Sequence, residues 1–342
     1  MLKKKELKTK SIIIAEVGQN HQGSLKLAKK YVEVFASLGA DVIKFQTRNN
    51  KSLFSKDAYN KEYNNDNAFA KKYGHHREKL ELSYSDLKIL KNLCRKLKVK
   101  FMSTPFDESS VELLKKIKVD LYKVSSFDLG NLPLINQIAK TKIPTVISTG
   151  GGDLKQIQES AKILKKNKSE HAILHCVSEY PCEYNKLGLE KIKKLSKLFP
   201  NTSIGLSDHF NGILSGPVAY LLGARVFEKH VTFNRAWKGT DHKFSMEPEG
   251  FRKFVRDIRR VNLMMKEKNK KTLGKEPVFI KLGKSIIAKN DIISGKKITI
   301  NDISGKIFEK QYFPIRNCHL IIGKKLKKNI KKGEIILKSY VV

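Results

Sequence analysis

The sequence lacks the features that would indicate a membrane protein, a disulfide scaffold or a zinc-thiolate site. It has no apolar run of transmembrane length, and the apolar stretch behind its basic start, Ile12–Ala15, is too short for a signal peptide. Its four cysteines, Cys94, Cys176, Cys182 and Cys318, are widely spaced and form no Cys-x-x-Cys pair. Such cysteines suit a reducing compartment, so we predict a cytoplasmic protein without a membrane partner.

Acidic residues are also scarce, because 33 Asp and Glu stand against 69 Lys and Arg and leave a formal net charge of +36. This charge raises nucleic acid or an anionic surface as a partner. The positive residues are mostly Lys, however, and they are spread along the chain, whereas base-reading interfaces usually depend on Arg. We therefore disfavour a nucleic-acid function and expect a surface that attracts anionic metabolites.

What the chain does contain is a regular alternation of short apolar runs and amphipathic stretches over its first 268 residues. Strictly alternating strands and helices predict a parallel sheet, and eight such units close into a (β/α)8 TIM barrel. An open doubly wound sheet is the rival, but no Gly-x-Gly-x-x-Gly follows the first strand. The expected strands are Ser11–Val17, Val42–Gln46, Lys100–Thr104, Leu121–Val124, Thr145–Thr149, Ala172–Cys176, Ser203–Ser207 and Val226–His230.

Two further segments complete the expected organisation. The long connection from Thr47 to Ser83 follows a barrel strand, so we expect it to form a lid or a wall of the substrate site. A charged linker over 269–283 leads to a small, mostly β domain over 284–342, which at that size should dock elsewhere. Its expected β-type segments are Ser285–Ala288, Lys297–Ile300, His319–Ile322 and Glu334–Leu337.

Two of the expected strands end in histidine. Ser203–Leu206 runs into Ser207, Asp208 and His209, and Val226–His230 repeats an apolar start with a terminal His. Histidines at the ends of adjacent strands are suited to share one metal ion. The alternative, equally weighted at this point, is that each His caps its strand and bonds neighbouring backbone.

Other strand ends supply hydrogen-bond donors and one acid. Lys44 and Lys123, together with Thr104, Ser126 and Ser148, would suit a small phosphorylated ligand at the barrel mouth. Each hydroxyl taken alone is more typical of a helix cap. Burying two unpaired Lys in a barrel mouth costs much free energy, however, so the two lysines are harder to explain without a ligand. Glu16, which closes the first strand, is either a surface residue or a buried acid, and beside two Lys we expect it to stay ionised and act as a base.

Taken in order, these motifs resemble the sialic acid synthases, and the tail resembles that family's antifreeze-like (SAF, β-clip) domain. The resemblance in the tail comes from Leu282–Ser285 and Ile322–Lys325. Any one motif is weak, whereas the ordered set is specific. The matching stretches of the barrel are Ile13–Gly23, Ile43–Gln46, Ser103–Phe106, Tyr122–Ser126, Gly205–His209, Glu228–His230 and Trp237–His242.

The resemblance implies condensation of phosphoenolpyruvate with N-acetylmannosamine to give a nine-carbon 2-keto sugar acid and phosphate. It implies Glu16 as the catalytic carboxylate and His209 and His230 as ligands of a divalent metal, Mn²⁺ or Mg²⁺. It also implies a homodimer in which each small domain covers the other subunit's barrel. The residues implied for the phosphoenolpyruvate pocket are Lys44, Thr104, Lys123, Ser126, Ser148 and Ser207, and those implied for the sugar are Gln46, Asp128, Tyr180, Asp241 and Lys310.

Two departures leave the acceptor sugar open. Position 128 is Asp where many bacterial members have Glu, and the stretch Phe308–Pro314 lacks the Arg that those members present from the small domain, so Lys310 is a candidate substitute. Tyr73–His76 and Trp237–Gly239 look more like the animal enzymes, which use the 6-phosphate. The alternatives are a 9-phosphate synthase, a legionaminic-type synthase or, in a different class, an inactive basic barrel that binds anions or nucleic acid.

Overall fold

The computed structural model describes residues 1–4, 7, 10–267 and 272–342. Contacts between residues divide the chain into two compact units, Met1–Met265 and Lys266–Val342. The expected linker, 269–283, begins in residues that lie outside the described ones, and its later part contains the short helix α12, Pro277–Leu282. No helix of the described residues is both long enough and apolar enough to cross a bilayer.

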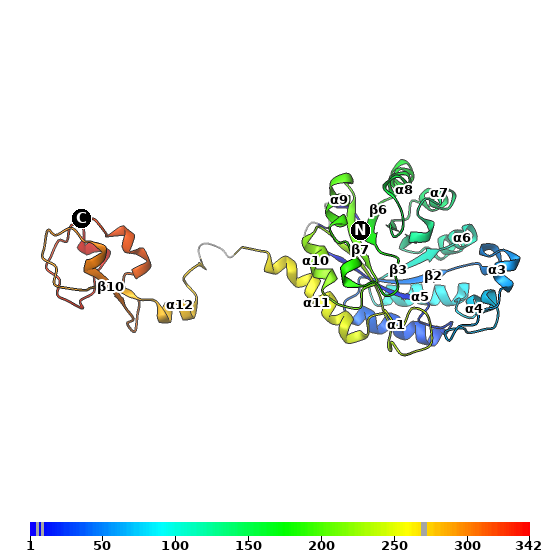
Figure 1. The fold of residues 1–342 in the computed structure, drawn as a ribbon, viewed down its shortest axis with the longest axis horizontal. Coiled ribbons are helices and arrows are strands. Elements are labelled where there is room, and N and C mark those ends of the chain that lie inside the picture. The colour runs from blue at the N-terminus through cyan, green and yellow to red at the C-terminus, as the bar shows by residue number, and fades with distance from the viewer. Residues whose placement is uncertain (5–6, 8–9, 268–271) are drawn as a thin grey trace. The chain divides into compact units, whose positions relative to one another are not determined.

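The first unit is a closed barrel of eight parallel strands within the described residues, which confirms the predicted (β/α)8 fold and excludes the open sheet (Figure 1). The strands pair in chain order, and β1 closes the barrel by pairing with β8. Their bounds agree with the expected ones to within a residue at each end. The strands are β1 Ile12–Gly18, β2 Val42–Thr47, β3 Lys100–Pro105, β4 Leu121–Val124, β5 Thr145–Ser148, β6 His171–Cys176, β7 Ser203–Asp208 and β8 Val226–His230.

Helices follow the strands and surround the barrel (Figure 1). Several begin at side-chain caps, such as Ser24 before α1, Asp107 before α6 and Asp153 before α8, where an oxygen accepts a free backbone N–H. The barrel helices are α1 Leu25–Ser37, α5 Tyr84–Lys96, α6 Glu108–Ile117, α7 Leu132–Lys140, α8 Leu154–Lys166, α9 Lys191–Leu198, α10 Ser215–Leu221 and α11 Pro248–Met264, with short 3-10 turns η1 Ser126–Asp128 and η2 Tyr184–Lys186.

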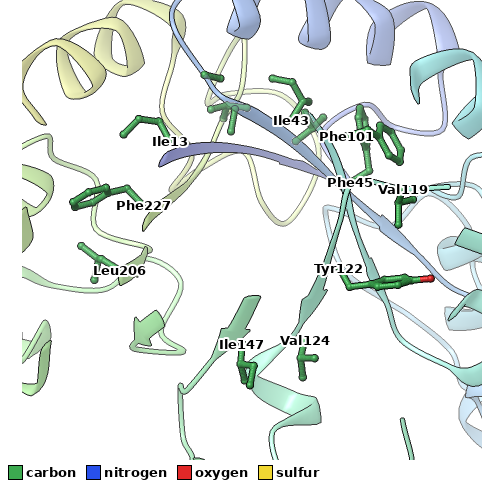
Figure 2. Packing of buried hydrophobic residues seen from close by; sticks show 14 of the residues in the cluster. Ile13, Ile43, Phe45, Phe101, Val119, Tyr122, Val124, Ile147, Leu206 and Phe227 are labelled. Atoms are coloured by element: carbon green, nitrogen blue, oxygen red, sulfur yellow. The ribbon is translucent and has the colours of Figure 1, made fainter. Parts of the chain in front are cut away.

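Successive side chains of each strand alternate between the barrel interior and the surrounding helices. In β1, Ile13 and Ala15 pack outward in the large core between strands and helices, of which Figure 2 shows a part. Ile12 and Ile14 point inward into a second apolar cluster. The next inward position is Glu16, so the interior changes from apolar to charged on going up the strand. The inner cluster comprises Leu2, Leu7, Ile12, Ile14, Val42, Met102, Leu121, Val146, Ala172, Leu174 and Val226.

Leu2 and Leu7 show that the chain's start completes the lower half of the interior. Both are buried, and the backbone oxygen of Leu2 accepts a hydrogen bond of 2.5 Å from Ser203 Oγ at the start of β7. Apolar side chains, Leu2 and Leu7 among them, therefore seal the barrel interior at the amino-terminal ends of the strands.

The long connection after β2 folds into three short helices, α2 Asn50–Leu53, α3 Lys56–Asn60 and α4 Tyr73–Glu78. Its parts are packed closely: a Cβ atom at Gly74 of α4 would lie 2.2 Å from the ring of Tyr59, so only glycine fits under this ring. Side chains of this segment line the cavity described below, which agrees with the expected substrate wall.

The second unit contains a two-stranded antiparallel sheet, β9 Ser285–Ala288 and β10 Ile303–Lys306, over a small core that includes Ile286, Ile298 and Ile336. Of the expected β-type segments only the first is a strand. The interpretation of His319–Ile322 was wrong, since these residues form the end of the 3-10 helix η5, Ile315–Leu320, and a turn. The expected segments Lys297–Ile300 and Glu334–Leu337 are not strands, because the irregular loops here pair at single residues: Lys297 and Ile335 each make an isolated bridge. The strand β10 was not among the expected segments. Further 3-10 turns of this unit are η4 Ile300–Asp302 and η6 Lys338–Tyr340.

Candidate active site

A cavity of about 660 Å³ opens at the carboxyl-terminal ends of the barrel strands. This is the end of the barrel where loops and strand ends can present reactive side chains. The structure brings every predicted site residue except Lys310 to its lining. These residues are Glu16, Lys44, Gln46, Thr104, Lys123, Ser126, Asp128, Ser148, Tyr180, Ser207, His209, His230 and Asp241.

Four buried charges form what we call the floor cluster: Glu16, Lys44, Lys123 and Glu228, none of them more than 3% exposed. Lys44 Nζ lies 2.9 Å from Glu16 Oε2 and 3.5 Å from Glu228 Oε1. Lys123 Nζ lies 3.8 Å from Glu228 Oε1 and donates a 3.2 Å bond to the backbone oxygen of Val124. The cluster contains two positive and two negative charges, and their mutual attraction offsets the free-energy cost of burying all four.

The environment of the floor cluster moves each pKa in a direction that fits a reactive site. Burial raises the pKa of Glu16, against the opposing charge of Lys44. Burial also lowers the pKa of Lys123, which the Glu228 carboxylate only partly offsets. For Lys44 burial acts in the same direction, but the two carboxylates outweigh it and raise its pKa. Glu16 thus has the stronger basicity that proton abstraction near neutral pH requires.

The hydroxyl groups at the strand ends are free of the capping role that was their alternative. Helix α8 is capped by Asp153 rather than Ser148, and η1 by Ser125 rather than Ser126. Ser126 Oγ instead accepts a 3.0 Å bond from the Gly150 backbone N–H. Within the described residues Ser148 Oγ is buried without a hydrogen-bond partner. A buried hydroxyl without a partner in the cavity lining is a group that a ligand would satisfy.

His209 and His230 lie side by side, with ring centroids 5.3 Å apart. His209 Nδ1 contacts the backbone oxygen of Val177 at 2.8 Å, which holds the ring in the tautomer whose Nε2 has a free lone pair. His230 is buried, its pKa is well below the ordinary value because of burial, and its Nδ1 lacks a hydrogen-bond partner among the described residues. Asp241 Oδ2 is 3.8 Å from this atom.

These imidazoles fit a divalent cation that is completed by other ligands. Among the residues that the structure describes, no three His, Cys, Asp or Glu side chains group so that they could hold a metal ion by themselves. Two imidazole nitrogens would therefore supply part of a coordination sphere, and water or substrate oxygens the rest.

The residues predicted for the sugar lie higher in the cavity. Gln46 Nε2 donates a 2.8 Å bond to Glu16 Oε1, and its Oε1 accepts from Arg48 Nη2. The Tyr180 ring packs on His209 with centroids 4.2 Å apart. Asp128 accepts from Ser125 Oγ and Asn131 Nδ2 within its own turn. Lys310 lies in the second unit, where its ammonium is 5.5 Å from the ring of Tyr312, and its role stays a prediction.

Sequence reasoning gave no role to four residues that the structure places in or directly beneath this site. Glu228 stands two positions before His230, and the alternation of β8 could have revealed that it faces inward. Arg48 likewise stands two positions after Gln46. Gln19 and Arg77 had no such signal, because only the folding of the long connection brings α4 against the loop after β1.

Comparison with known proteins gives one consistent family. The NeuB family matches residues 31–270. The human N-acetylneuraminate-9-phosphate synthase is 33% identical over 330 residues, which cover 96% of this chain and 92% of the human protein. The N,N'-diacetyllegionaminic acid synthase of Campylobacter jejuni is 35% identical over 339 residues, which cover 96% and 99% of the two chains.

A solved structure resembles the present one in the same way. The N-acetylneuraminic acid (sialic acid) synthetase of Leptospira borgpetersenii, crystallised with citrate, superposes with a TM-score of 0.69 at 29% identity. The match covers 78% of this chain and 90% of that one. Both sequence and fold therefore relate this barrel to synthases of nine-carbon sugar acids.

Proposed function

This chain belongs to the NeuB family of nonulosonic acid synthases, and from that premise we propose that it condenses phosphoenolpyruvate with an N-acetylated amino sugar. The products are a nine-carbon 2-keto sugar acid, of the N-acetylneuraminate or legionaminate type, and inorganic phosphate. The observation that carries this proposal is the floor cluster, which holds two buried ammonium groups beside a carboxylate of raised pKa at the base of one cavity.

Phosphoenolpyruvate is the substrate that the floor would hold. It carries a phosphate and a carboxylate, so it requires positive charge and many donors. Lys44 and Lys123 supply the charge, and Thr104, Ser126, Ser148 and Ser207 supply hydroxyl groups around them. Burial lowers the pKa of Lys123. A ligand anion close to this lysine would favour its charged form.

A divalent cation, Mn²⁺ or Mg²⁺, would be held by His209 and His230. When bound it would supply Lewis acidity that polarises the aldehyde oxygen of the open-chain sugar. The protein's own part is to present two imidazoles: the Val177 backbone oxygen orients His209, and burial keeps His230 uncharged.

The bond changes follow from this arrangement. The π electrons of phosphoenolpyruvate form a bond from its C3 to the aldehyde carbon, whose oxygen gains a proton and becomes a hydroxyl. Water adds to C2 and loses a proton, which Glu16 accepts. The resulting tetrahedral centre loses its hydroxyl proton and collapses to the ketone as the C2–O bond to phosphate breaks. Phosphate leaves with the bonding electron pair and takes up this proton. Lys44, 2.9 Å from Glu16, would hold both the base and the anionic substrate in place.

The test is phosphate release from phosphoenolpyruvate in the presence of Mn²⁺, with N-acetylmannosamine, its 6-phosphate and a 2,4-diacetamido-6-deoxy hexose as acceptors. We expect turnover with at least one acceptor, loss of turnover on chelation of the metal, and loss of turnover in His230→Ala with an unchanged melting temperature. Near-normal metal-dependent activity of His230→Ala would remove the proposed metal site. Steeply salt-dependent DNA retention without any turnover would instead support a basic binding protein. The predicted homodimer and cytoplasmic location are separate expectations.

A further inference from the structure

The cavity wall contributed by the long connection holds a cation, Arg77, that forms no ion pair with a carboxylate of the described residues. Arg77, at the end of α4, lines the cavity beside Tyr73 and Gln19. Its guanidinium donates 3.0 and 2.7 Å bonds from Nε and Nη2 to Tyr73 Oη, and a 2.6 Å bond from Nη1 to Gln19 Oε1. All these acceptors are neutral, and no carboxylate within the described residues forms an ion pair with Arg77.

The other cations of the lining differ in this respect. Lys44 and Lys123 face Glu16 and Glu228 in the floor cluster. Arg48 Nη1 pairs with Glu81 Oε1 at 3.2 Å, and its side chain is only 8% exposed. Each of these positive charges is therefore matched by a directly paired carboxylate before a ligand arrives. Arg77 is partly buried and only shares the more distant charge of Glu81 with Arg48. A guanidinium on a cavity wall that forms no direct ion pair attracts an anion.

A second group beside Arg77 points to the same ligand. Gln19 is 7% exposed and lines the cavity, and its Nε2 is buried without a hydrogen-bond partner within the described ranges. The amide orientation follows from Arg77, because the guanidinium requires the oxygen on its side and so leaves the NH₂ group unsatisfied. A buried donor without an acceptor destabilises the folded protein, and a ligand that brings an acceptor removes this cost. An anionic group with several oxygens would satisfy both Arg77 and Gln19 Nε2.

The wall that contains Arg77 would contact a different substrate from the one that the floor cluster binds. If the floor binds phosphoenolpyruvate, the sugar extends from the reacting centre at Glu16 past Gln46, which bonds to both Glu16 and Arg48. Arg48 and Arg77 are near enough for the charge of each to disfavour that of the other, and the carboxylate ion-paired here, Glu81, is shared by both guanidinium groups. This wall is therefore more positive than the ion pair of Arg48 and Glu81 alone implies. The end of the sugar remote from its aldehyde would meet this positive wall.

We infer that the wall formed by Arg77 and Gln19, with Arg48 behind it, is a subsite for a phosphate group on the acceptor sugar. The physiological acceptor is then an amino sugar phosphorylated at its terminal hydroxyl, and the product is a nine-carbon sugar acid that keeps this phosphate. The inference rests on the proposed function. It also requires that a kinase-type reaction supply the acceptor, since the phosphate of phosphoenolpyruvate leaves as inorganic phosphate.

The test compares N-acetylmannosamine and its 6-phosphate in the wild type and in Arg77→Gln, with Lys79→Gln as the matched control. Lys79 lies at the end of the same helix with an exposed side chain, so its substitution removes the same charge outside the cavity. We expect the wild type to prefer the phosphorylated acceptor. Arg77→Gln should lower kcat/KM for this acceptor about 10- to 100-fold, because charge-assisted bonds to phosphate are lost. Arg77→Gln should lower kcat/KM for the unphosphorylated sugar much less than for the 6-phosphate, and all parameters of Lys79→Gln should match those of the wild type.

Calorimetry of each sugar's binding separates this inference from the proposed function. Tighter binding of the 6-phosphate that Arg77→Gln abolishes would support the subsite even if no acceptor gave turnover, in which case the proposed reaction would be wrong. A wild type that prefers the unphosphorylated sugar, or an Arg77→Gln variant that weakens both sugars equally, would overturn the subsite and leave the reaction standing. Equal weakening would mean that Arg77 only fastens α4 to the loop after β1.

Discussion

Two groups of charged side chains that are buried in the barrel differ in how completely their hydrogen bonds are satisfied. The floor cluster of Glu16, Lys44, Lys123 and Glu228 faces inward at the base of the cavity. The outer pair, Asp208 of β7 and Lys229 of β8, faces the surrounding helices, and Lys229 Nζ lies 2.7 Å from Asp208 Oδ2. Both groups are almost fully buried. They lie on opposite faces of the barrel sheet, because successive side chains of a strand point to opposite faces.

The outer pair is complete. Asp208 also accepts a 2.5 Å bond from Ser215 Oγ and a 3.0 Å bond from the Phe210 backbone N–H, and Lys229 also donates to the Phe210 and Gly212 backbone oxygens. In the floor cluster, by contrast, Glu228 Oε2 has no hydrogen-bond partner within the described residues. The difference teaches that complete buried pairs hold the fold, whereas incomplete ones keep bonding capacity for a ligand.

The largest effect is expected from breaking the outer pair. Lys229→Met leaves the Asp208 carboxylate buried without its counter-ion, so the free energy of unfolding should fall by about 3–5 kcal/mol. Urea unfolding followed by circular dichroism measures this. The double variant Asp208→Leu with Lys229→Met removes both charges and should recover most of the loss. A single variant as stable as the wild type would contradict the structural role of this pair.

Breaking the floor cluster should reverse the pattern. Lys123→Met is expected to lower kcat/KM for phosphoenolpyruvate by about 10²- to 10³-fold, which is typical of losing a charged group that contacts the developing charge. Stability should fall less than in Lys229→Met, because Lys44 still lies 3.5 Å from Glu228 and Glu16, whose pKa burial raises, is able to take up a proton and restore the charge balance. Lys116→Met, at an exposed position of α6, is the control for loss of one positive charge. If Lys123→Met unfolds as Lys229→Met does, the two groups are not different in kind.

The acid of the floor cluster sharpens the comparison through pH. The pKa of Glu16 is raised by burial, so the base form should be lost as the pH falls through a value above 4.5. The kcat of the wild type should therefore decrease on the acid side. Glu16→Gln should lower kcat about 10²-fold and remove this limb. Because the raised pKa means that ionised Glu16 disfavours the folded state, stability from this group is present at low pH and is lost as the pH rises through its folded pKa. Glu16→Gln should then be at least as stable as the wild type at neutral pH.

The smallest effect concerns the Ser148 hydroxyl, which has no partner among the described residues. Ser148→Ala should raise the KM for phosphoenolpyruvate about 10-fold, since one bond to a charged ligand is lost. Stability without ligand should be unchanged or slightly higher, because an unsatisfied buried hydroxyl is removed. Steady-state kinetics and thermal unfolding measure the two sides. A destabilised variant with normal KM would assign Ser148 to the fold.

The barrel and most of its site were within reach of sequence reasoning because both depend on local periodicity. An alternation of two along each strand separates Ile14 from Ala15 and then leads to Glu16, and the same period carries Val42 to Lys44 and Val226 to Glu228. Glu228 was overlooked although this pattern contains it. In the second unit the period failed, since segments of four residues there pair at single bridges and His319–Ile322 turns instead of extending.

The sequence by itself determined the eight strand-helix units, the apolar lower half of the barrel and the polar strand ends, because each follows from the order of residues within a single element. Only the tertiary structure decided which charges are compensated. Whether Lys229 meets Asp208, whether Arg77 meets a carboxylate, and whether Ser148 finds a partner all depend on side chains that are far apart in the chain. Pairing is a property of the space between elements, and in this barrel it separates the groups that hold the fold from those available to a ligand.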